Sequence, residues 1–220
     1  MRSPSASTSL LQQAYDEVVG DVELAGANDP TRVRLLDAAY EQFCRMGIAR
    51  SSLDEVARRA GLSRVTIYRK FETKDALVEE VMLREFRRYL LQFLADIAGA
   101  PTAAERLVRG FVSAHRAIST NPLIGGLLEA EPSLLAGAIG GDDGRMLAAV
   151  REFVAGQLRQ EQRAGEVPAD LDVNLSAEMM VRISASFLTI PSHIVDLNDT
   201  DGLADLARRY LVPMIQAPAP

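Results

Sequence analysis

The 220-residue chain has one cysteine, two histidines and no tryptophan. A single cysteine, Cys44, excludes an internal disulfide framework and suits a reducing, cytoplasmic location. We expect it to be a small buried hydrophobe rather than a redox switch. No apolar run has the length of a membrane span, and the N-terminus lacks the apolar core of a signal peptide. His115 and His193 lie far apart in the sequence, so we expect no metal site and no cofactor.

The sequence also lacks the motifs of the common enzyme classes. It contains no H-E-x-x-H, no G-x-S-x-G and no P-loop, and neither histidine lies beside a plausible nucleophile. The glycines of residues 137–144 follow no predicted strand, which argues against a nucleotide-binding loop. No segment alternates in the manner of a strand. The sequence therefore predicts an all-α protein that is not an enzyme.

Two short helices are predicted within residues 51–74. Ser52 followed by Glu55 forms a capping box that begins the first helix, and Gly61 is a typical helix end. Ser63 can then cap a second helix, so the segment reads as a helix-turn-helix. The inward apolar positions are Val56, Ala60, Leu62 and Ile67.

The outward face of the second helix carries side chains that protein–DNA interfaces use. Arg64, near the N-terminus of this helix, is placed to reach base edges, where a bidentate contact with guanine is the commonest specific pairing. Val65 and Thr66 offer methyl groups for contact with a thymine methyl. The side chains suited to phosphate oxygens are Tyr68, Arg69 and Lys74.

Positive charge is concentrated around this motif. Residues 32–74 carry 10 Arg or Lys and 5 Asp or Glu, whereas residues 1–31 carry 1 and 5, and residues 75–220 carry 13 and 20. The whole chain has a net charge of −6. A basic segment in an acidic chain is the electrostatic footprint of a phosphate-binding surface.

The region from Thr31 to Leu77 resembles the DNA-binding domain of TetR-family transcriptional regulators. The matching strings are Phe43-Cys-Arg-Met-Gly47, Ser52-Leu-Asp-Glu-Val-Ala, Ala60-Gly-Leu-Ser, Thr66-Ile-Tyr-Arg-Lys-Phe71 and Thr73-Lys-Asp-Ala-Leu77. The resemblance implies that DNA is contacted by Ser52, Ser63, Arg64, Val65, Thr66, Tyr68, Arg69 and Lys74. Val65 and Arg69 depart from the Gly or Ala and the His that many members carry, so the operator sequence is not predictable.

Three regions are expected along the chain. Residues 1–28 form a polar extension, partly disordered or with a short helix, which is either loosely docked or an arm that assists DNA binding. Residues 29–74 form the helix-turn-helix domain, and Asp29-Pro30 begins its first helix. Residues 75–216 form an effector-binding and dimerisation domain. Its predicted helices cover residues 74–98, 102–119, 121–130, 143–165, 173–190 and 200–214, with a possible short piece after Pro132.

The last two predicted helices are the most regular, and their apolar stripe is wider than one partner helix needs. The stripe predicts a homodimer interface, and packing within the chain is the alternative. The resemblance implies that these helices pair across a two-fold axis into a four-helix bundle. The predicted interface residues are Met179, Ile183, Phe187, Leu203, Leu206, Ala207, Tyr210 and Leu211.

The resemblance also implies a pocket for a small effector within the C-terminal helices. Its apolar, Phe- and Met-rich lining favours a hydrophobic molecule over a sugar phosphate. His115 is equally compatible with a satisfied core histidine and with a ligand contact. About a third of the candidates are expected to line a cavity, and the rest to be ordinary core. The candidate lining residues are Phe86, Tyr89, Leu90, Phe93, Phe111, His115, Met146, Val150, Phe153, Met180, Ile183 and Phe187.

The function expected from these features is conditional repression. A homodimer would bind a near-palindromic double-stranded DNA operator and release it when a small hydrophobic effector binds. Two alternatives remain: a constitutive or architectural DNA-binding protein without an effector, and an activator. No membrane partner is expected.

Overall fold

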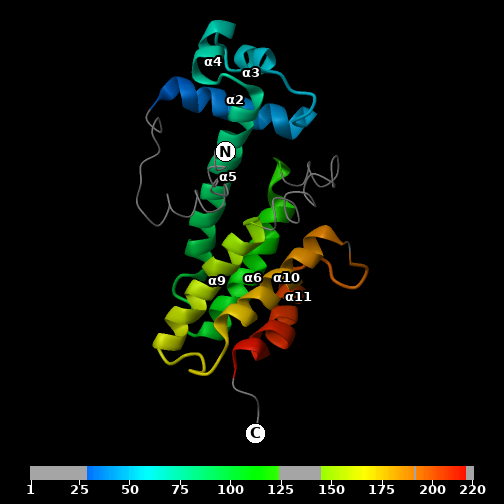
Figure 1. Ribbon diagram of the computed structural model, residues 1–220. Helices are drawn as coiled ribbons and strands as arrows, with labels where there is room; N and C mark the ends of the chain where they lie inside the picture. The colour runs from blue at the N-terminus through cyan, green and yellow to red at the C-terminus, as the bar shows by residue number, and fades with distance from the viewer. Residues whose placement is uncertain (1–28, 124–144, 191, 217–220) are drawn as a thin grey trace, which may run out of the picture. The chain divides into compact units, whose positions relative to one another are not determined.

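The computed structural model describes residues 29–123, 145–190 and 192–216 (Figure 1). Every regular element in these ranges is helical, which confirms the predicted all-α class. No helix in the described ranges is long and apolar enough to cross a membrane. The described residues form two compact units, residues 29–90 with 122–123, and residues 91–121 with the described part of 145–216.

The N-terminal unit contains α2 (Pro30–Met46), α3 (Leu53–Arg59), α4 (Arg64–Lys70) and most of α5 (Lys74–Ile97). The Asp29 side chain caps α2 by accepting a hydrogen bond from the backbone N–H of Thr31, 3.0 Å away. Lys70 lies 2.6 Å from the other carboxylate oxygen of Asp29 and lowers the pKa of that carboxyl. This ion pair links the residue before α2 to the last residue of α4.

The core of the N-terminal unit is built from α2, α3, α4 and the first turns of α5. Buried side chains from each helix meet there, including Leu35, Val56, Ile67 and Val81. The compact unit extends to residue 90 because α5 contributes to this core well beyond Lys74. Cys44 packs partly buried against the same core, and burial raises the pKa of its thiol. A protonated thiol is a poor nucleophile, which fits the predicted role of Cys44 as a small hydrophobe.

Two arginines fasten α5 to α2. Arg32 pairs with Glu80, and its guanidinium lies 4.8 Å from the centroid of the Phe71 ring. Arg84 donates to a carboxylate oxygen of Asp37 at 2.7 Å. Both side chains of the Arg32–Glu80 pair are largely shielded from solvent, so this pair is screened less than a surface ion pair, whereas Asp37 is exposed. They fix the orientation of α5 within the N-terminal unit.

The C-terminal unit contains the end of α5 together with α6 (Ala103–Thr120), α9 (Arg145–Arg163), α10 (Val173–Thr189) and α11 (Thr200–Leu206). Side chains of Thr102, Asp172 and Asp199 cap α6, α10 and α11. These bounds confirm the predicted helices within one to two residues, except at the C-terminus. Buried residues from α6, α9, α10 and the C-terminal run form one core.

The prediction of one regular helix over residues 200–214 is wrong in its second half. The α-helix ends at Leu206 and is followed by a π-helical turn, Ala207–Leu211, and a 3₁₀ turn, Val212–Ile215. Pro213 explains the change, because proline has no N–H to donate and its ring clashes with the carbonyl four residues earlier. A wider turn before the proline removes that clash.

Several predictions lie outside the described residues. They are the N-terminal extension, most of the short helix expected over residues 121–130, the piece after Pro132 and the glycine-containing segment 137–144. Pro122 and Leu123, at the start of the expected helix, are helical.

Gly61 provides a stability test of the turn between α3 and α4. Its φ is +63°, and an added Cβ would have only an ordinary contact, 3.4 Å from the Arg34 guanidinium. We expect Gly61→Ala to lower the free energy of unfolding by about 1–2 kcal/mol, because an L-residue is strained at this φ. Gly156 on α9 is the control, since a methyl group added there would have nothing within 4 Å. Gly156→Ala should stabilise by about 0.5–1 kcal/mol, and equal effects of the two changes in urea unfolding would contradict this account.

Candidate nucleic-acid interface

A tight turn sets the angle between α3 and α4. The backbone N–H of Leu62 donates to the carbonyl of Ala57 at 2.9 Å, and Gly61 takes the left-handed conformation that this reversal needs. Arg34, reaching from α2, donates to the carbonyl of Ala60 at 2.7 Å. The C-terminal end of α3 is therefore held from a third helix, and α4 leaves the turn in a fixed direction. Figure 1 shows α3 and α4 side by side at one end of the unit.

The two predicted serine caps are confirmed, and both hydroxyls are committed to them. The Ser52 hydroxyl donates to the Glu55 carboxylate at 2.9 Å and accepts from the Glu55 backbone N–H. The Ser63 oxygen accepts from the Thr66 N–H at 3.1 Å and shares a 2.8 Å hydrogen bond with the Thr66 hydroxyl. A phosphate oxygen can only accept, so Ser52 would have to release Glu55 to donate to DNA.

Arg64 and Val65 project from the first turn of α4. Val65 is 75% exposed, although it is a large apolar residue on a helix with a buried face. The Arg64 guanidinium lies 5.3 Å from the centroid of the Tyr68 ring, and its Nε is 3.2 Å from an Asp54 carboxylate oxygen. This ion pair is exposed, and exposed pairs contribute little free energy. It can orient Arg64 without opposing a stronger contact to DNA.

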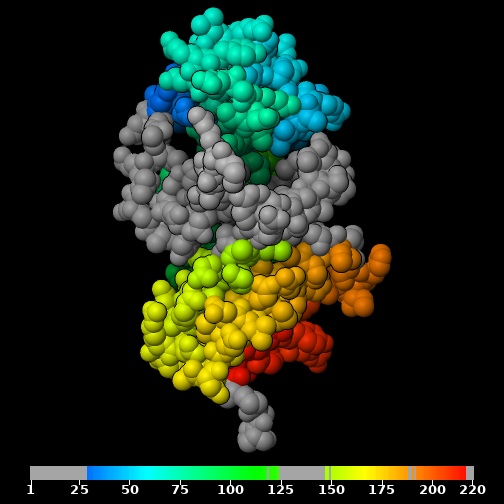
Figure 2. Space-filling view, in the orientation of Figure 1, coloured from blue at the N-terminus to red at the C-terminus, as the bar shows by residue number. Residues whose placement is uncertain are grey.

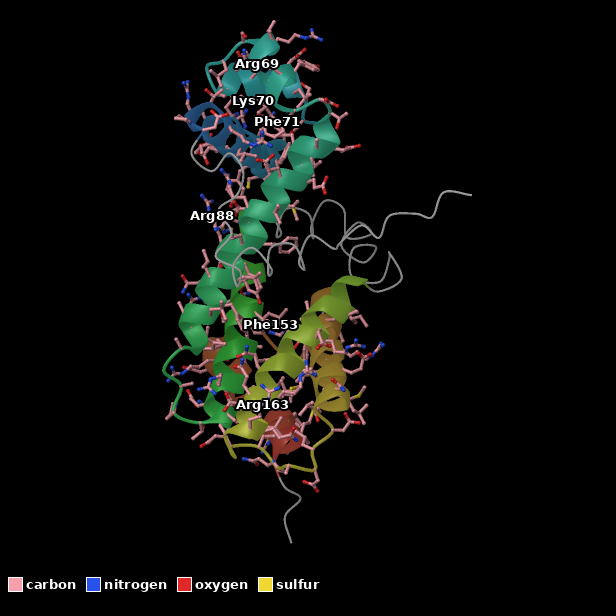
Figure 3. The ribbon with its side chains drawn as sticks, turned by 60° about the vertical axis from the view of Figure 1, so that its left-hand side comes forward. Arg69, Lys70, Phe71, Arg88, Phe153 and Arg163 are labelled. Atoms are coloured by element: carbon pink, nitrogen blue, oxygen red, sulfur yellow. The ribbon has the colours of Figure 1, made fainter. Side chains whose placement is uncertain are left out.

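The remaining predicted DNA contacts differ in how much of their bonding capacity is already used. Arg69 is exposed and makes no hydrogen bond or ion pair with the described part of the chain; Figure 3 shows it on the outer side of α4. Lys74 donates to the carbonyl of Ala49 at 3.0 Å, which leaves two of its N–H groups and its charge for a phosphate. Tyr68 is exposed on α4.

Arg58 on α3 is a further candidate for DNA contact that was not predicted from the sequence. It is exposed and, like Arg69, has no ion pair within the described ranges, whereas the adjacent Arg59 contacts Glu41 and Gln42. The sequence carries no signal that separates these neighbouring arginines. Their roles differ because only one faces α2.

The predicted pocket residues are divided between the two units. Phe86, Tyr89 and Leu90 belong to the N-terminal unit. In the C-terminal unit, Phe93 and Phe153 make an edge-to-face contact with ring centroids 5.6 Å apart, and Figure 3 shows Phe153 among the helices. Phe111, His115 and Met180 are buried, while Val150, Ile183 and Phe187 are half-buried. The Met146 side chain lies outside the described parts.

The predicted dimer residues fall into two groups. Leu203, Ala207 and Leu211 are buried in the core of their own chain, so they support the outer surface rather than form it. Met179 and Tyr210 are exposed, and Ile183, Leu206 and Phe187 are partly buried. Leu175, one turn before Met179 on α10, is exposed as well and was not predicted. For Leu203, Ala207 and Leu211, the structure therefore agrees with the alternative that the apolar stripe of the last two helices packs within its own chain.

The capped helix pair, the outward cations and the exposed valine together define a helix-turn-helix DNA-binding protein. Residues 35–81 match the family model described as bacterial regulatory proteins, tetR family. Residues 35–81 therefore form a DNA-binding domain of the TetR type.

Three similar proteins illustrate the extent of the match. The HTH-type transcriptional regulator UidR of Escherichia coli is 27% identical over 167 residues, which cover 72% of this chain and 80% of UidR. The structure of GusR from Salmonella enterica has a TM-score of 0.64 at 20% identity and covers 86% of this chain and 98% of GusR. FadR from Bacillus subtilis, solved with stearoyl-CoA, has a TM-score of 0.58 at 20% identity over 85% of this chain and 99% of FadR. The structural matches extend the shared fold to nearly the whole chain.

Arg64→Ala tests the base-reading role of Arg64. On an operator selected from random duplex DNA, we expect a loss of about tenfold to a hundredfold in specific affinity, because a bidentate base contact contributes about 1–3 kcal/mol. Affinity for random DNA should fall much less. Arg163→Ala, which removes an exposed arginine from the last turn of α9, is the matched control and should bind normally. Unchanged selectivity in Arg64→Ala would remove Arg64 from the base-reading set.

Proposed function

We propose that this protein is a homodimeric repressor that holds a near-palindromic operator and releases it when a hydrophobic small molecule binds. The observation that carries the proposal is the presence of a second helical unit with its own core, beyond the small unit that DNA binding requires. FadR, which shares the fold, was solved with stearoyl-CoA, and this supports an apolar effector here. We propose a cytoplasmic location, because a repressor must reach the DNA that it regulates.

Dimerisation is proposed through the exposed faces of α10 and the C-terminal run. Leu175 and Met179 lie one turn apart on α10, and Tyr210 lies on the π-helical turn. The Ser176 hydroxyl donates to the Met214 carbonyl at 3.4 Å, so α10 and the C-terminal run pack together beside these residues. Exposed apolar side chains on packed helices are typical of a subunit interface. Two copies would place two α4 helices about one helical turn of DNA, 34 Å, apart.

The effector site is proposed within the C-terminal unit. Phe93, Phe111, Phe153 and Phe187 supply aromatic surface from four different helices, and the rings of Phe93 and Phe153 contact each other. Helical bundles commonly enclose small apolar ligands between facing helices. The helix α5 begins in the core of the N-terminal unit and ends in the C-terminal unit, where Phe93 contacts Phe153, so it offers a continuous connection from an effector to the DNA-binding helices. In this proposal the DNA-binding function ends at about Lys74, although the first part of α5 packs in the N-terminal unit and its last part lies in the C-terminal unit.

Met179→Asp tests the dimer. We expect the dimer dissociation constant to rise by about a hundredfold or more, because a two-fold interface would bury the carboxylate twice without a partner. Sedimentation velocity over a dilution series measures this change, and operator affinity should fall with it. Leu91→Asp, at an exposed leucine on α5, is the matched control and should stay dimeric. A dimer that is indifferent to Met179→Asp would place the interface elsewhere.

Effector release is tested by gel shift with the selected operator and a panel of fatty acids, acyl-CoA esters, long-chain alcohols and alkylphenols. We expect at least one class to lower operator affinity tenfold or more, because a ligand shifts the balance by its difference in affinity for the two states. A sugar phosphate of similar size serves as the control and should have no effect. If the full panel leaves operator affinity unchanged, the constitutive DNA-binding alternative replaces the switch.

A further inference from the structure

His115 is a buried polar residue in the apolar interior of the C-terminal unit. It lies on α6 and is only 2% exposed. Its ring centroid is 4.2 Å from that of Phe111 and 6.2 Å from that of Phe187 on α10. Phe187 is itself only half-buried, so apolar surface remains uncovered beside the imidazole within the described ranges.

The hydrogen bonding of His115 fixes its tautomer. Nδ1 lies 2.8 Å from the backbone carbonyl oxygen of Phe111. A carbonyl oxygen can only accept, so Nδ1 must carry the hydrogen. Burial lowers the pKa of the imidazole, so the ring is neutral at pH 7 and Nε2 presents a lone pair. The carbonyls of Phe111 and Ser184 act in the opposite direction, toward the charged form, but more weakly than burial.

Nε2 has no hydrogen-bond partner among the described residues, although it is buried. A buried acceptor without a donor is unfavourable, and the great majority of such groups are paired. A molecule bound beside Nε2 could supply the donor that the described residues do not. An incoming carboxylate cannot supply it, because a carboxylate only accepts and would meet the lone pair.

The charges around this region also favour an uncharged molecule. Arg106, Arg109, Arg151 and Arg159, the partly buried arginines described on α6 and α9, are each paired with a glutamate. Arg182 on α10 pairs with Glu178. Arg116 on α6 and Arg163 on α9 have no such pair, but both are solvent-exposed, so neither is a buried cation able to receive an acid group.

We propose that His115 is the polar recognition point of the effector site and accepts, through Nε2, a hydrogen bond from a hydroxyl or amide N–H on an otherwise apolar, uncharged molecule. The inference rests on the proposed effector function and narrows it to neutral hydrogen-bond donors. A free fatty acid, which is a carboxylate at pH 7, cannot supply this hydrogen bond.

Matched probes test the proposal with the full-length dimer. One series is octane, octan-1-ol, octanamide and octanoate, and the other is propylbenzene, 4-propylphenol, 4-propylbenzamide and 4-propylbenzoate. Binding is measured by thermal shift and calorimetry without DNA. We expect the alcohol or amide of at least one series to bind about tenfold more tightly than its headless and carboxylate counterparts, which is the worth of one neutral hydrogen bond. His115→Phe should abolish this preference and leave the headless compound unaffected, while His193→Phe, at an exposed histidine, should change nothing.

Several outcomes would overturn the proposal. They are preference for the carboxylates, equal binding of headed and headless probes as a trapped water on Nε2 would give, no binding by any probe, and a head-group preference that survives in His115→Phe. Nitrogen-15 NMR of the ligand-free protein is an independent check that needs no variant. It should show neutral His115 with the hydrogen on Nδ1, and a protonated Nε2 would contradict the inference.

The proposal and the function on which it rests fail in different ways. Probes that bind through His115 but never release operator DNA would leave the recognition point intact and refute the switch. Release of operator by a compound whose binding ignores His115 would support the switch and refute the recognition point.

Discussion

The DNA-binding surface depends on the burial of one face of two helices that are too short to persist alone. Helices α3 and α4 have seven residues each, and isolated helices shorter than about 12–15 residues are marginal in water. They are held by Val56 and Ile67, which have no exposed surface, and by serine caps at both N-termini. Arg34 adds a third hold on the turn. The outward residues of α4 are therefore presented on a support that comes almost entirely from the other helices.

The local features of this support were predictable from sequence. Ser52 with Glu55, Gly61, and Ser63 are signals that act within four residues, and each is found in its expected role. The buried positions of Val56 and Ile67 follow from helical periodicity alone. The resemblance of residues 31–77 to the TetR family correctly implied a second helical unit after the DNA-binding domain.

Contacts between distant residues were not predictable. Lys70 with Asp29, Lys74 with Ala49 and Arg64 with Asp54 join positions whose proximity depends on tertiary packing. The same limit applies to Leu203 and Leu211, because an apolar stripe does not reveal whether its partner is the same chain or a second copy. The π-helical turn is different, because Pro213 is a local signal against a regular α-helix through residues 207–214.

The uneven use of arginine has a kinetic consequence. Arg58 and Arg69 are solvent-exposed and uncommitted, whereas most of the arginines described on α6, α9 and α10 are neutralised by a neighbouring carboxylate. Residues 75–220 still carry a surplus of acidic groups. A DNA duplex therefore attracts one part of the molecule and repels the other, so the electric field turns the protein before contact. Encounters begin with α3 and α4 toward the duplex, and the rate of productive collision rises as ionic strength falls.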